Sequence, residues 1–276
     1  MSKDVWYIRT YTCDNGVEYK TKFPVSECVS YTKSRKKKSA YIARAERCAT
    51  DAAHELGRLL NCNFITGVDF HLVLTYSDKG LEELQKKAGA EDTEQLIRQA
   101  KREYDNCMKR AKYRAEKKAI EIKAAAVLSI TNPETGELVR IHHHVVINAN
   151  AAPLLAECWR AGDVRMRVLY SHNGPDLQEL ADYMIAQAAR VGADKRYTHT
   201  RNLNRAEVSR PIKARNPAAE LKVPRECREI WRSEYKPGRP QHIRYYRPPA
   251  TPNDIRQNKE VNNEKNGVES ESTADY

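Results

Sequence analysis

The chain has 276 residues, of which 31% are charged and 40% hydrophobic, so it can form the core of one large domain or two small ones. Because 48 Lys and Arg outnumber 37 Asp and Glu, the net charge is +11, which favours a polyanionic partner, by default nucleic acid. No apolar run reaches the ~20 residues that span a membrane. The N-terminus also lacks the apolar core of a signal peptide. We therefore expect a cytoplasmic protein with no membrane partner.

The charges are unevenly distributed along the chain, and the cysteines show no pairing pattern. Residues 251–276 carry three basic and six acidic side chains, so the first 250 residues carry +14. We expect this acidic tail to be disordered. The seven cysteines are scattered and never form a CxxC pair, which argues against a disulfide framework and against a zinc finger.

The first 65 residues predict a β-hairpin followed by a helix. Two alternating segments, 5–12 and 17–23, flank Asn15-Gly16, a typical hairpin turn. Apolar residues at spacings of three and four predict a helix over 40–60. We expect residues 1–65 to pack on a core domain. The basic run at 33–38 fits either a solvated surface or a phosphate contact.

Residues 66–195 predict the core itself. In chain order we expect a strand over 70–76, a charged turn over 77–80, a helix over 92–117, strands over 124–131 and 138–148, a helix over 153–161, a strand over 164–170 and a final helix over 175–191. The loop 132–137 reads as a tight hairpin connection. The first six helices and strands match the β-α-β-β-α-β order of a ferredoxin-like antiparallel sheet, so the fold class is α+β. Residues 196–250 are basic and rich in proline, and we expect an irregular extension there.

A histidine cluster carries the clearest chemical signal. Because side chains alternate across a strand, Arg140, His142 and His144 share one face, whereas His143 lies on the mostly apolar face that meets the core. Two imidazoles about 7 Å apart along the backbone can converge on one divalent ion. Surface histidines on a half-exposed strand are the alternative.

A tyrosine on the last helix of the core is the second signal. Tyr183 lies outside the apolar stripe of the helix over 175–191, and Gln187 falls on the same side one turn later. We expect Tyr183 to point toward the polar face of the sheet. A half-buried tyrosine on a helix flank is the alternative.

Together these segments resemble the HUH endonuclease superfamily. The resemblance is to its rolling-circle replication initiators, including replication-associated proteins of the filamentous-phage initiator type, and it covers residues 1–210. The matching pieces are Leu72-Val73-Leu74-Thr75-Tyr76, His142-His143-His144 and Tyr183. Their order favours an initiator over a relaxase, in which the tyrosine comes before the histidines. His143 departs from the family pattern, which has a hydrophobe at that position.

The resemblance implies nicking and rejoining of single-stranded DNA at a replication origin. His142 and His144 would hold Mg²⁺ or Mn²⁺, and Tyr183 would form a 5′-phosphotyrosine intermediate and leave a 3′-OH primer. Arg140, Gln187, Arg196 and Arg201 are the candidate DNA contacts. No phosphate-binding loop for ATP occurs, so unwinding would need a separate host helicase. A transposase of the same superfamily and a non-catalytic basic nucleic-acid-binding protein are the alternatives.

Overall fold

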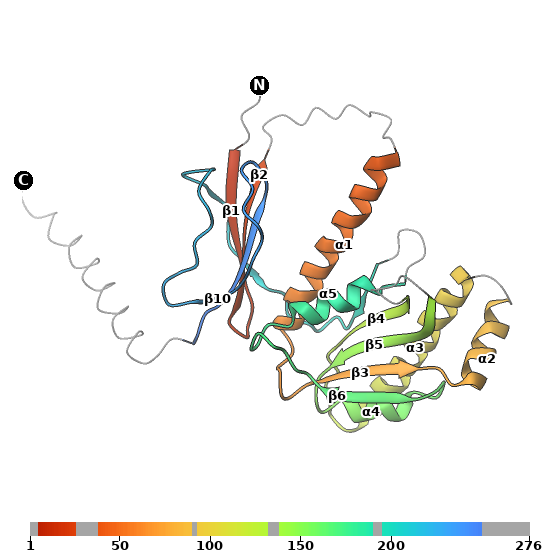
Figure 1. The fold of residues 1–276 in the computed structure, drawn as a ribbon. Helices are drawn as coiled ribbons and strands as arrows, with labels where there is room; N and C mark the ends of the chain where they lie inside the picture. The colour runs from red at the N-terminus through yellow and green to blue at the C-terminus, as the bar shows by residue number, and fades with distance from the viewer. Residues whose placement is uncertain (1–4, 26–37, 90–92, 132–137, 190–194, 250–276) are drawn as a thin grey trace, which may run out of the picture.

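The computed structural model describes residues 5–25, 38–89, 93–131, 138–189 and 195–249. The chain is α+β, with two antiparallel sheets and five helices in these ranges (Figure 1). The helices are α1 Lys38–Asn61, α2 Asp78–Ala88, α3 Thr93–Lys117, α4 Ala152–Cys158 and α5 Gln178–Ala186. None of these helices is both long enough and apolar enough to cross a bilayer.

The core sheet is formed by the middle of the chain. Its strands lie in the order β6-β3-β5-β4-β7, and every neighbouring pair is antiparallel. Their bounds are β3 Phe70–Thr75, β4 Ala124–Thr131, β5 Leu138–Ile147, β6 Val164–Val168 and β7 Thr198–His199. The predicted strands and the long helix α3 are confirmed. The connection 132–137 lies outside the described residues.

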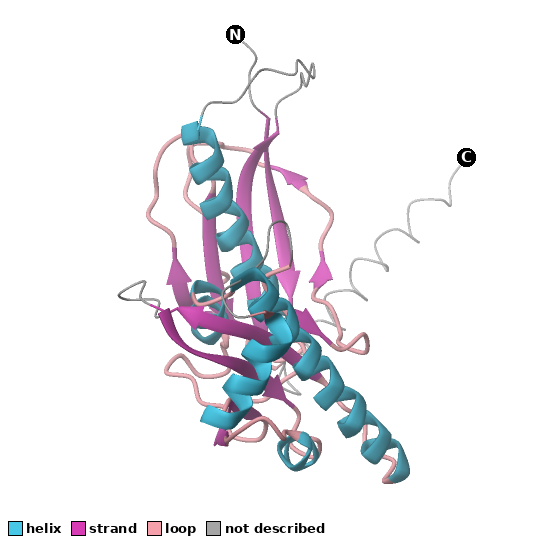
Figure 2. Cartoon of the chain, turned by 90° about the vertical axis from the view of Figure 1, so that its right-hand side faces the viewer, coloured by secondary structure: helices cyan, strands magenta, loops and turns pink. Residues whose placement is uncertain are grey.

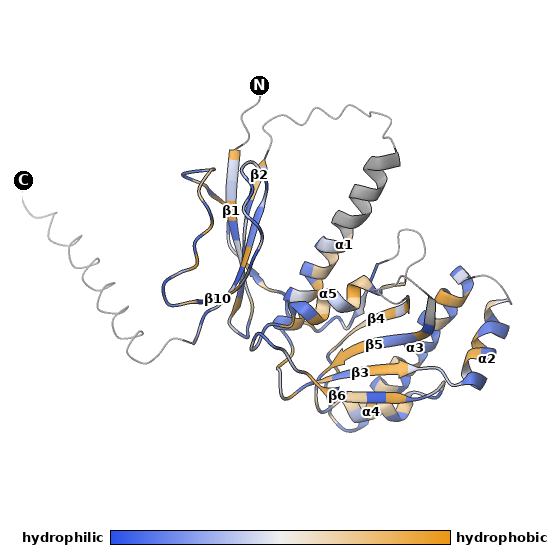
Figure 3. Ribbon diagram, viewed as in Figure 1, coloured by the Kyte–Doolittle hydropathy of each residue, from blue (hydrophilic) through white to orange (hydrophobic). Residues whose placement is uncertain are grey.

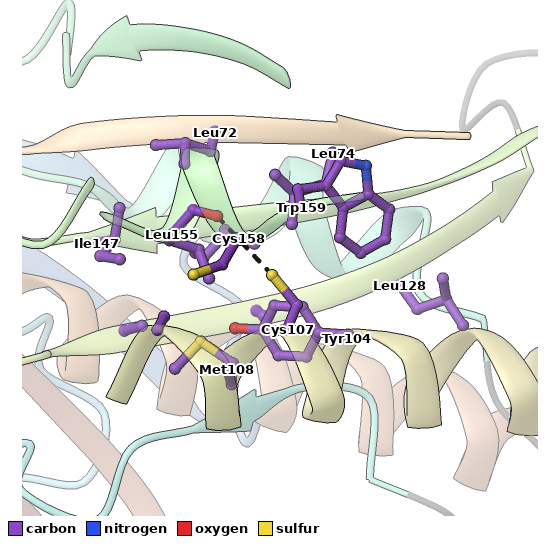
Figure 4. Packing of buried hydrophobic residues seen from close by; sticks show 14 of the residues in the cluster. Leu72, Leu74, Tyr104, Cys107, Met108, Leu128, Ile147, Leu155, Cys158 and Trp159 are labelled. Carbon is purple, nitrogen blue, oxygen red and sulfur yellow. Dashed lines mark hydrogen bonds between the residues drawn. The ribbon is translucent and has the colours of Figure 1, made fainter. Parts of the chain in front are cut away.

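One face of this sheet packs on α3 and α4. Alternate residues of the strands, such as Leu72, Leu74 and Leu128, meet Tyr104 and Met108 of α3 in the largest buried cluster (Figure 4). Figure 3 shows that hydrophobic residues predominate along β4 and in α4. This burial explains why the local apolar patterns of the core were readable from the sequence.

The opposite face is covered by α1 and α5. Val127 of β4 and Val146 of β5 contact a second cluster that contains Leu56 of α1 and both Ala181 and Met184 of α5. Helix α5 covers Gln178–Ala186 and is therefore shorter than the helix predicted over 175–191. The two helices therefore fix where the outward-facing side chains of α5 lie relative to the sheet.

A further helix occurs where a charged turn was expected. Ser77 begins it, since its side-chain oxygen accepts a hydrogen bond of 3.1 Å from the backbone N–H of Gly80. This is an N-cap, which serine favours strongly. Leu84 of the resulting helix α2 is buried in the α3 side of the core. The expectation of a simple turn was wrong because serine starts helices as readily as turns.

The other sheet joins the two ends of the described chain. Its order is β10-β11-β2-β1-β8, and β9 also pairs with β1. The strands are β1 Val5–Thr12, β2 Val17–Val25, β8 Glu207–Val208, β9 Ile212–Lys213, β10 Arg228–Arg232 and β11 Gln241–Tyr246. The N-terminal hairpin is thus confirmed. Residues 196–250 differ from the irregular extension expected, because β11 buries Ile243 and Tyr245 against the hairpin. The tail 251–276 and the basic run 33–37 lie outside the described residues.

A buried polar network joins this sheet to the core. The side-chain amide of Asn61, at the end of α1, donates hydrogen bonds to Tyr19 Oη at 2.8 Å and to Asp176 Oδ1 at 2.9 Å. The Nε atom of Arg244 in β11 lies 3.1 Å from Asp176 Oδ2, and both side chains are buried. Asp176 lies two residues before the start of α5, so the ion pair helps to hold α5 against the second sheet.

Replacing Arg244 with methionine should lower the free energy of unfolding by about 3 kcal/mol, because the carboxylate of Asp176 is left buried without its cation. Chemical denaturation followed by circular dichroism measures this. Arg114→Met is the matched control, since Arg114 forms an exposed ion pair of 3.3 Å with Glu157. The control should cost less than about 1 kcal/mol. Equal losses for the two variants would contradict a structural role for the buried pair.

Candidate metal and tyrosine site

Three imidazoles form a row on the face of the core sheet that α1 and α5 cover in part. In the strand register, Val73 of β3 faces His144 of β5, so His71 lies diagonally beside His144 on the same face. His71 Nε2 is 3.1 Å from His144 Nδ1, and His142 Nε2 is 3.1 Å from His144 Nε2. His144 therefore has a histidine neighbour at each ring nitrogen.

Burial keeps the rings of His71 and His144 neutral, and hydrogen bonds fix the position of a proton on His142. Burial, assisted by the charges of its two histidine neighbours, lowers the pKa of His144 to about 3, although a hydrogen bond with Gln187 acts in the opposite direction. Burial and the charge of Arg167 lower the pKa of His71 to about 4. The Nδ1 of His142 lies 2.7 Å from the carbonyl oxygen of Arg140. That oxygen can only accept, so Nδ1 of His142 carries a proton, and its Nε2 atom faces His144.

Tyr183 lies beside this row. Its ring meets that of His144 edge-on, with 5.4 Å between the ring centroids, and the side chain is 48% exposed. Helix α5 presents it on the side away from Ala181 and Met184, which are buried. Tyr183 is therefore close to the imidazole row and open to a large substrate.

Gln187 lies under the tyrosine and is buried. Its Nε2 donates a hydrogen bond of 3.4 Å to the backbone oxygen of Tyr183, and its Oε1 accepts one of 3.1 Å from Ser129 Oγ. Because Gln187 also bonds to His144, its carboxamide links β4, β5 and the end of α5. Gln187 lies on the same side as Tyr183, as the helical spacing predicted. Its carboxamide forms hydrogen bonds with other groups of the protein.

His143 points to the other face of the sheet, as predicted. It is buried, its Nε2 lies 3.2 Å from Tyr76 Oη, and its ring stacks on that of Tyr104 with 5.1 Å between centroids. Burial lowers the pKa of His143 to about 3, so the ring is a neutral part of the core. The strand alternation of β5 therefore separates His143 from its two neighbours.

The candidate arginines lie in different places. Arg140 is exposed and pairs with Asp78 at 2.7 Å, next to the imidazole row through its backbone oxygen. Arg196 lines a small cavity with Tyr104 and His143, on the α3 side of the sheet and away from Tyr183. Arg201 is exposed in the turn after β7. Of these three candidates, the structure brings Arg140 alone near the histidine pair.

The imidazoles of His142 and His144 suit a divalent ion. Two nitrogen ligands at about 2.0–2.1 Å from an ion lie about 2.9–3.3 Å from each other, depending on the bond angle at the metal. The 3.1 Å between the Nε2 atoms of His142 and His144 falls in that interval. Across the described ranges, no group of three or more His, Cys, Asp or Glu side chains is arranged as a metal-binding set. An ion held by this pair would thus need further ligands, such as water or phosphate oxygens.

His71 is the residue that sequence reasoning left unassigned. Its position on the same face as the histidine pair was readable from the strand period, but its neighbour on β5 depends on the register between β3 and β5. When Nδ1 of His144 donates a hydrogen bond to Nε2 of His71, the Nε2 lone pair of His144 is free to bind an ion. His71 therefore acts as a positioning residue for His144.

Replacing His71 with alanine should weaken Mn²⁺ binding by about 10- to 100-fold, because His144 loses the partner that sets its tautomer and ring orientation. Titration calorimetry with Mn²⁺ alone measures the effect. His71→Gln should restore much of the affinity, since the amide oxygen can accept from Nδ1. Unchanged affinity in His71→Ala would contradict this role.

Comparisons of the chain with protein-family models, with curated proteins and with solved structures find no match. The functional conclusion therefore depends on the geometry of the site.

Proposed function

We propose that the protein is a metal-dependent nuclease and strand transferase for single-stranded DNA, acting as a rolling-circle replication initiator. One observation carries this proposal. Tyr183 of α5 lies against His144, which neighbours His142 on the same strand, so a nucleophile and an ion-binding pair share one open site. The HUH resemblance of the sequence supports the same function.

The topology of the core supports the proposed family. In chain order, the sheet β6-β3-β5-β4 places the fourth, first, third and second strands of the core side by side. With α3 and α4 on one face, this is the strand order of the ferredoxin-like arrangement that we propose for residues 70–168. In this arrangement β3 and β5 are central neighbours, which places the histidine row in the middle of the sheet.

The proposed reaction transfers a phosphoryl group to the tyrosine. Tyr183 Oη attacks the phosphorus of a phosphodiester, the new O–P bond forms, and the bond from phosphorus to the 3′ oxygen breaks. The phenol proton passes to solvent and the departing 3′ oxygen takes up a proton, so a 5′-phosphotyrosine and a free 3′-OH result. The number of phosphoester bonds is unchanged, so rejoining requires no ATP.

The surrounding residues prepare this step. His142 and His144 would hold Mg²⁺ or Mn²⁺, which when bound neutralises charge on the phosphate oxygens. Gln187 and the backbone contact that it makes with Tyr183 fix the end of α5 beside the histidine row. The exposed face of Tyr183 allows a strand to approach from solvent. A host helicase would supply single-stranded origin DNA in the cytoplasm.

A covalent trapping experiment tests the function. The protein is incubated with fluorescent single-stranded oligonucleotides carrying candidate origin sequences, with Mn²⁺ or with EDTA, and the products are separated under denaturing conditions. We expect an adduct that needs Mn²⁺ and that mass spectrometry maps to Tyr183. DNA binding without an adduct on any origin oligonucleotide would instead favour the non-catalytic nucleic-acid-binding alternative.

A further inference from the structure

A second concave site lies outside the tyrosine centre, between the first sheet and α1. It is a cleft of about 510 Å³, within the ~300–1,000 Å³ typical of ligand pockets. Figures 1 and 2 show α1 running alongside one face of the sheet that contains β1 and β2. The wall contributed by the sheet includes Arg9, Tyr11, Phe23 and His242.

Cation–aromatic pairs line this cleft. The guanidinium carbon of Arg9 lies 5.5 Å from the ring centroid of Phe23, and that of Arg58 lies 4.3 Å from the centroid of Tyr11. The Nε of Arg9 is buried and has no hydrogen-bond partner within the described part of the chain. Two stacked arginines therefore line the cleft, and Arg9 has a donor there that the described part of the protein leaves without a partner.

The cleft also carries groups that recognise hydrogen-bonding edges. His54 of α1 and His242 of β11 lie with their ring centroids 5.6 Å apart. Burial lowers the pKa of both, that of His54 to about 4, so each ring is neutral and offers a donor and an acceptor. Asp51 and Glu55 line the α1 wall. Carboxylates accept hydrogen bonds from base amino groups, as they do from cytosine.

We propose that this cleft binds a nucleotide of the single-stranded DNA substrate, with its base against the Tyr11 and Phe23 wall and its phosphate at Arg9 and Arg58. The inference depends on the proposed function for its ligand. Aromatic rings beside arginines are the usual platform for single-stranded nucleic acid, because stacking accepts any base and the guanidinium holds the phosphate. A site for a small acidic metabolite would not need the paired aromatic rings.

Helix α1 connects the cleft to the tyrosine helix. Its residues His54, Glu55 and Arg58 line the cleft, whereas Ala53, Leu56 and Leu60 pack with α5 in the cluster behind Tyr183. The segment after the tyrosine helix contributes Arg205, which lies 3.5 Å from Glu55 at the cleft. A strand held in the cleft would therefore cross α1 to reach Tyr183, and the cleft would hold DNA outside the nicked position.

A binding assay without metal tests the cleft. Fluorescence anisotropy with a labelled 25-nucleotide pool in EDTA is carried out on the full chain in a Tyr183→Phe background, so that nicking plays no part. The double variant Arg9→Gln, Phe23→Leu should raise Kd by about tenfold, as expected for the loss of one stacked and one phosphate-binding group. Arg239→Gln is the charge-matched control, because Arg239 is exposed in the turn between β10 and β11 and does not line the cleft. It should change Kd less than about twofold.

Two further measurements identify the occupant. Photocrosslinking with 5-iodouridine oligonucleotides should label peptides within residues 5–25 or 49–61. Competition with millimolar deoxynucleoside monophosphates should not displace the oligonucleotide. An unchanged Kd in the double variant, or crosslinks only elsewhere, would overturn the proposal, and displacement by mononucleotides would show a free-nucleotide site instead. Binding at the cleft without any Tyr183 adduct would refute the proposed function while leaving the cleft assignment intact.

Discussion

Tyr183→Phe should abolish the covalent protein–DNA adduct. The substitution removes only the hydroxyl oxygen, which is the proposed nucleophile, and keeps the ring that lies 5.4 Å from His144. Loss of a nucleophile lowers the rate of such a reaction by at least about 10³-fold. Denaturing gels of a time course with Mn²⁺ measure adduct yield, and anisotropy in EDTA should show that DNA binding is retained.

Tyr170→Phe is the matched control for this prediction. Tyr170 is 74% exposed, lies beyond the edge strand β6 and also loses only a hydroxyl. Its adduct yield should equal that of the unmodified chain. An adduct of unchanged yield in Tyr183→Phe would contradict the assignment of the nucleophile.

His142→Ala and His144→Ala should each prevent tight Mn²⁺ binding and lower the rate of adduct formation by about 10³-fold. The reason is that two imidazoles with Nε2 atoms 3.1 Å apart form the proposed ligand pair, and a bound ion contributes several kcal/mol to stabilising charge on a phosphoryl group. Calorimetry with Mn²⁺ measures binding, and the adduct time course measures the rate.

The control for the histidine variants is His172→Ala. His172 is an exposed residue that contacts Tyr170 and lies outside the imidazole row, so its replacement should leave both measurements unchanged. Full Mn²⁺ affinity in both His142→Ala and His144→Ala would show that the ion, if one binds, is held elsewhere.

The parts of the site that follow from local periodicity could be predicted. Alternation along β5 placed His142 and His144 on one face and His143 on the other, and the structure has that arrangement. The 100° spacing of α5 likewise placed Tyr183 outside the buried stripe. In both cases a single element decides the outcome, so no information about its neighbours was needed.

Features that depend on pairing between distant segments could not be predicted. The contact of His71 with His144 is set by the register of β3 against β5, and β11 reaches β2 across more than 200 residues of sequence. The proline-rich sequence around β11 gave no sign of this short strand, which pairs with β2 near the other end of the chain as well as with its sequence neighbour β10. The cleft between the first sheet and α1 is invisible in the sequence for the same reason.

The pairing of β2 with β11 also constrains synthesis of the protein. Residues 70–199, which contain the core sheet, leave the ribosome before Gln241–Tyr246 do, so that sheet can form while β2 still has an unpaired edge. An exposed edge strand invites pairing with another chain. A nascent or truncated chain that lacks residues 241–246 is therefore the form most prone to aggregate, and expression trials should retain this segment.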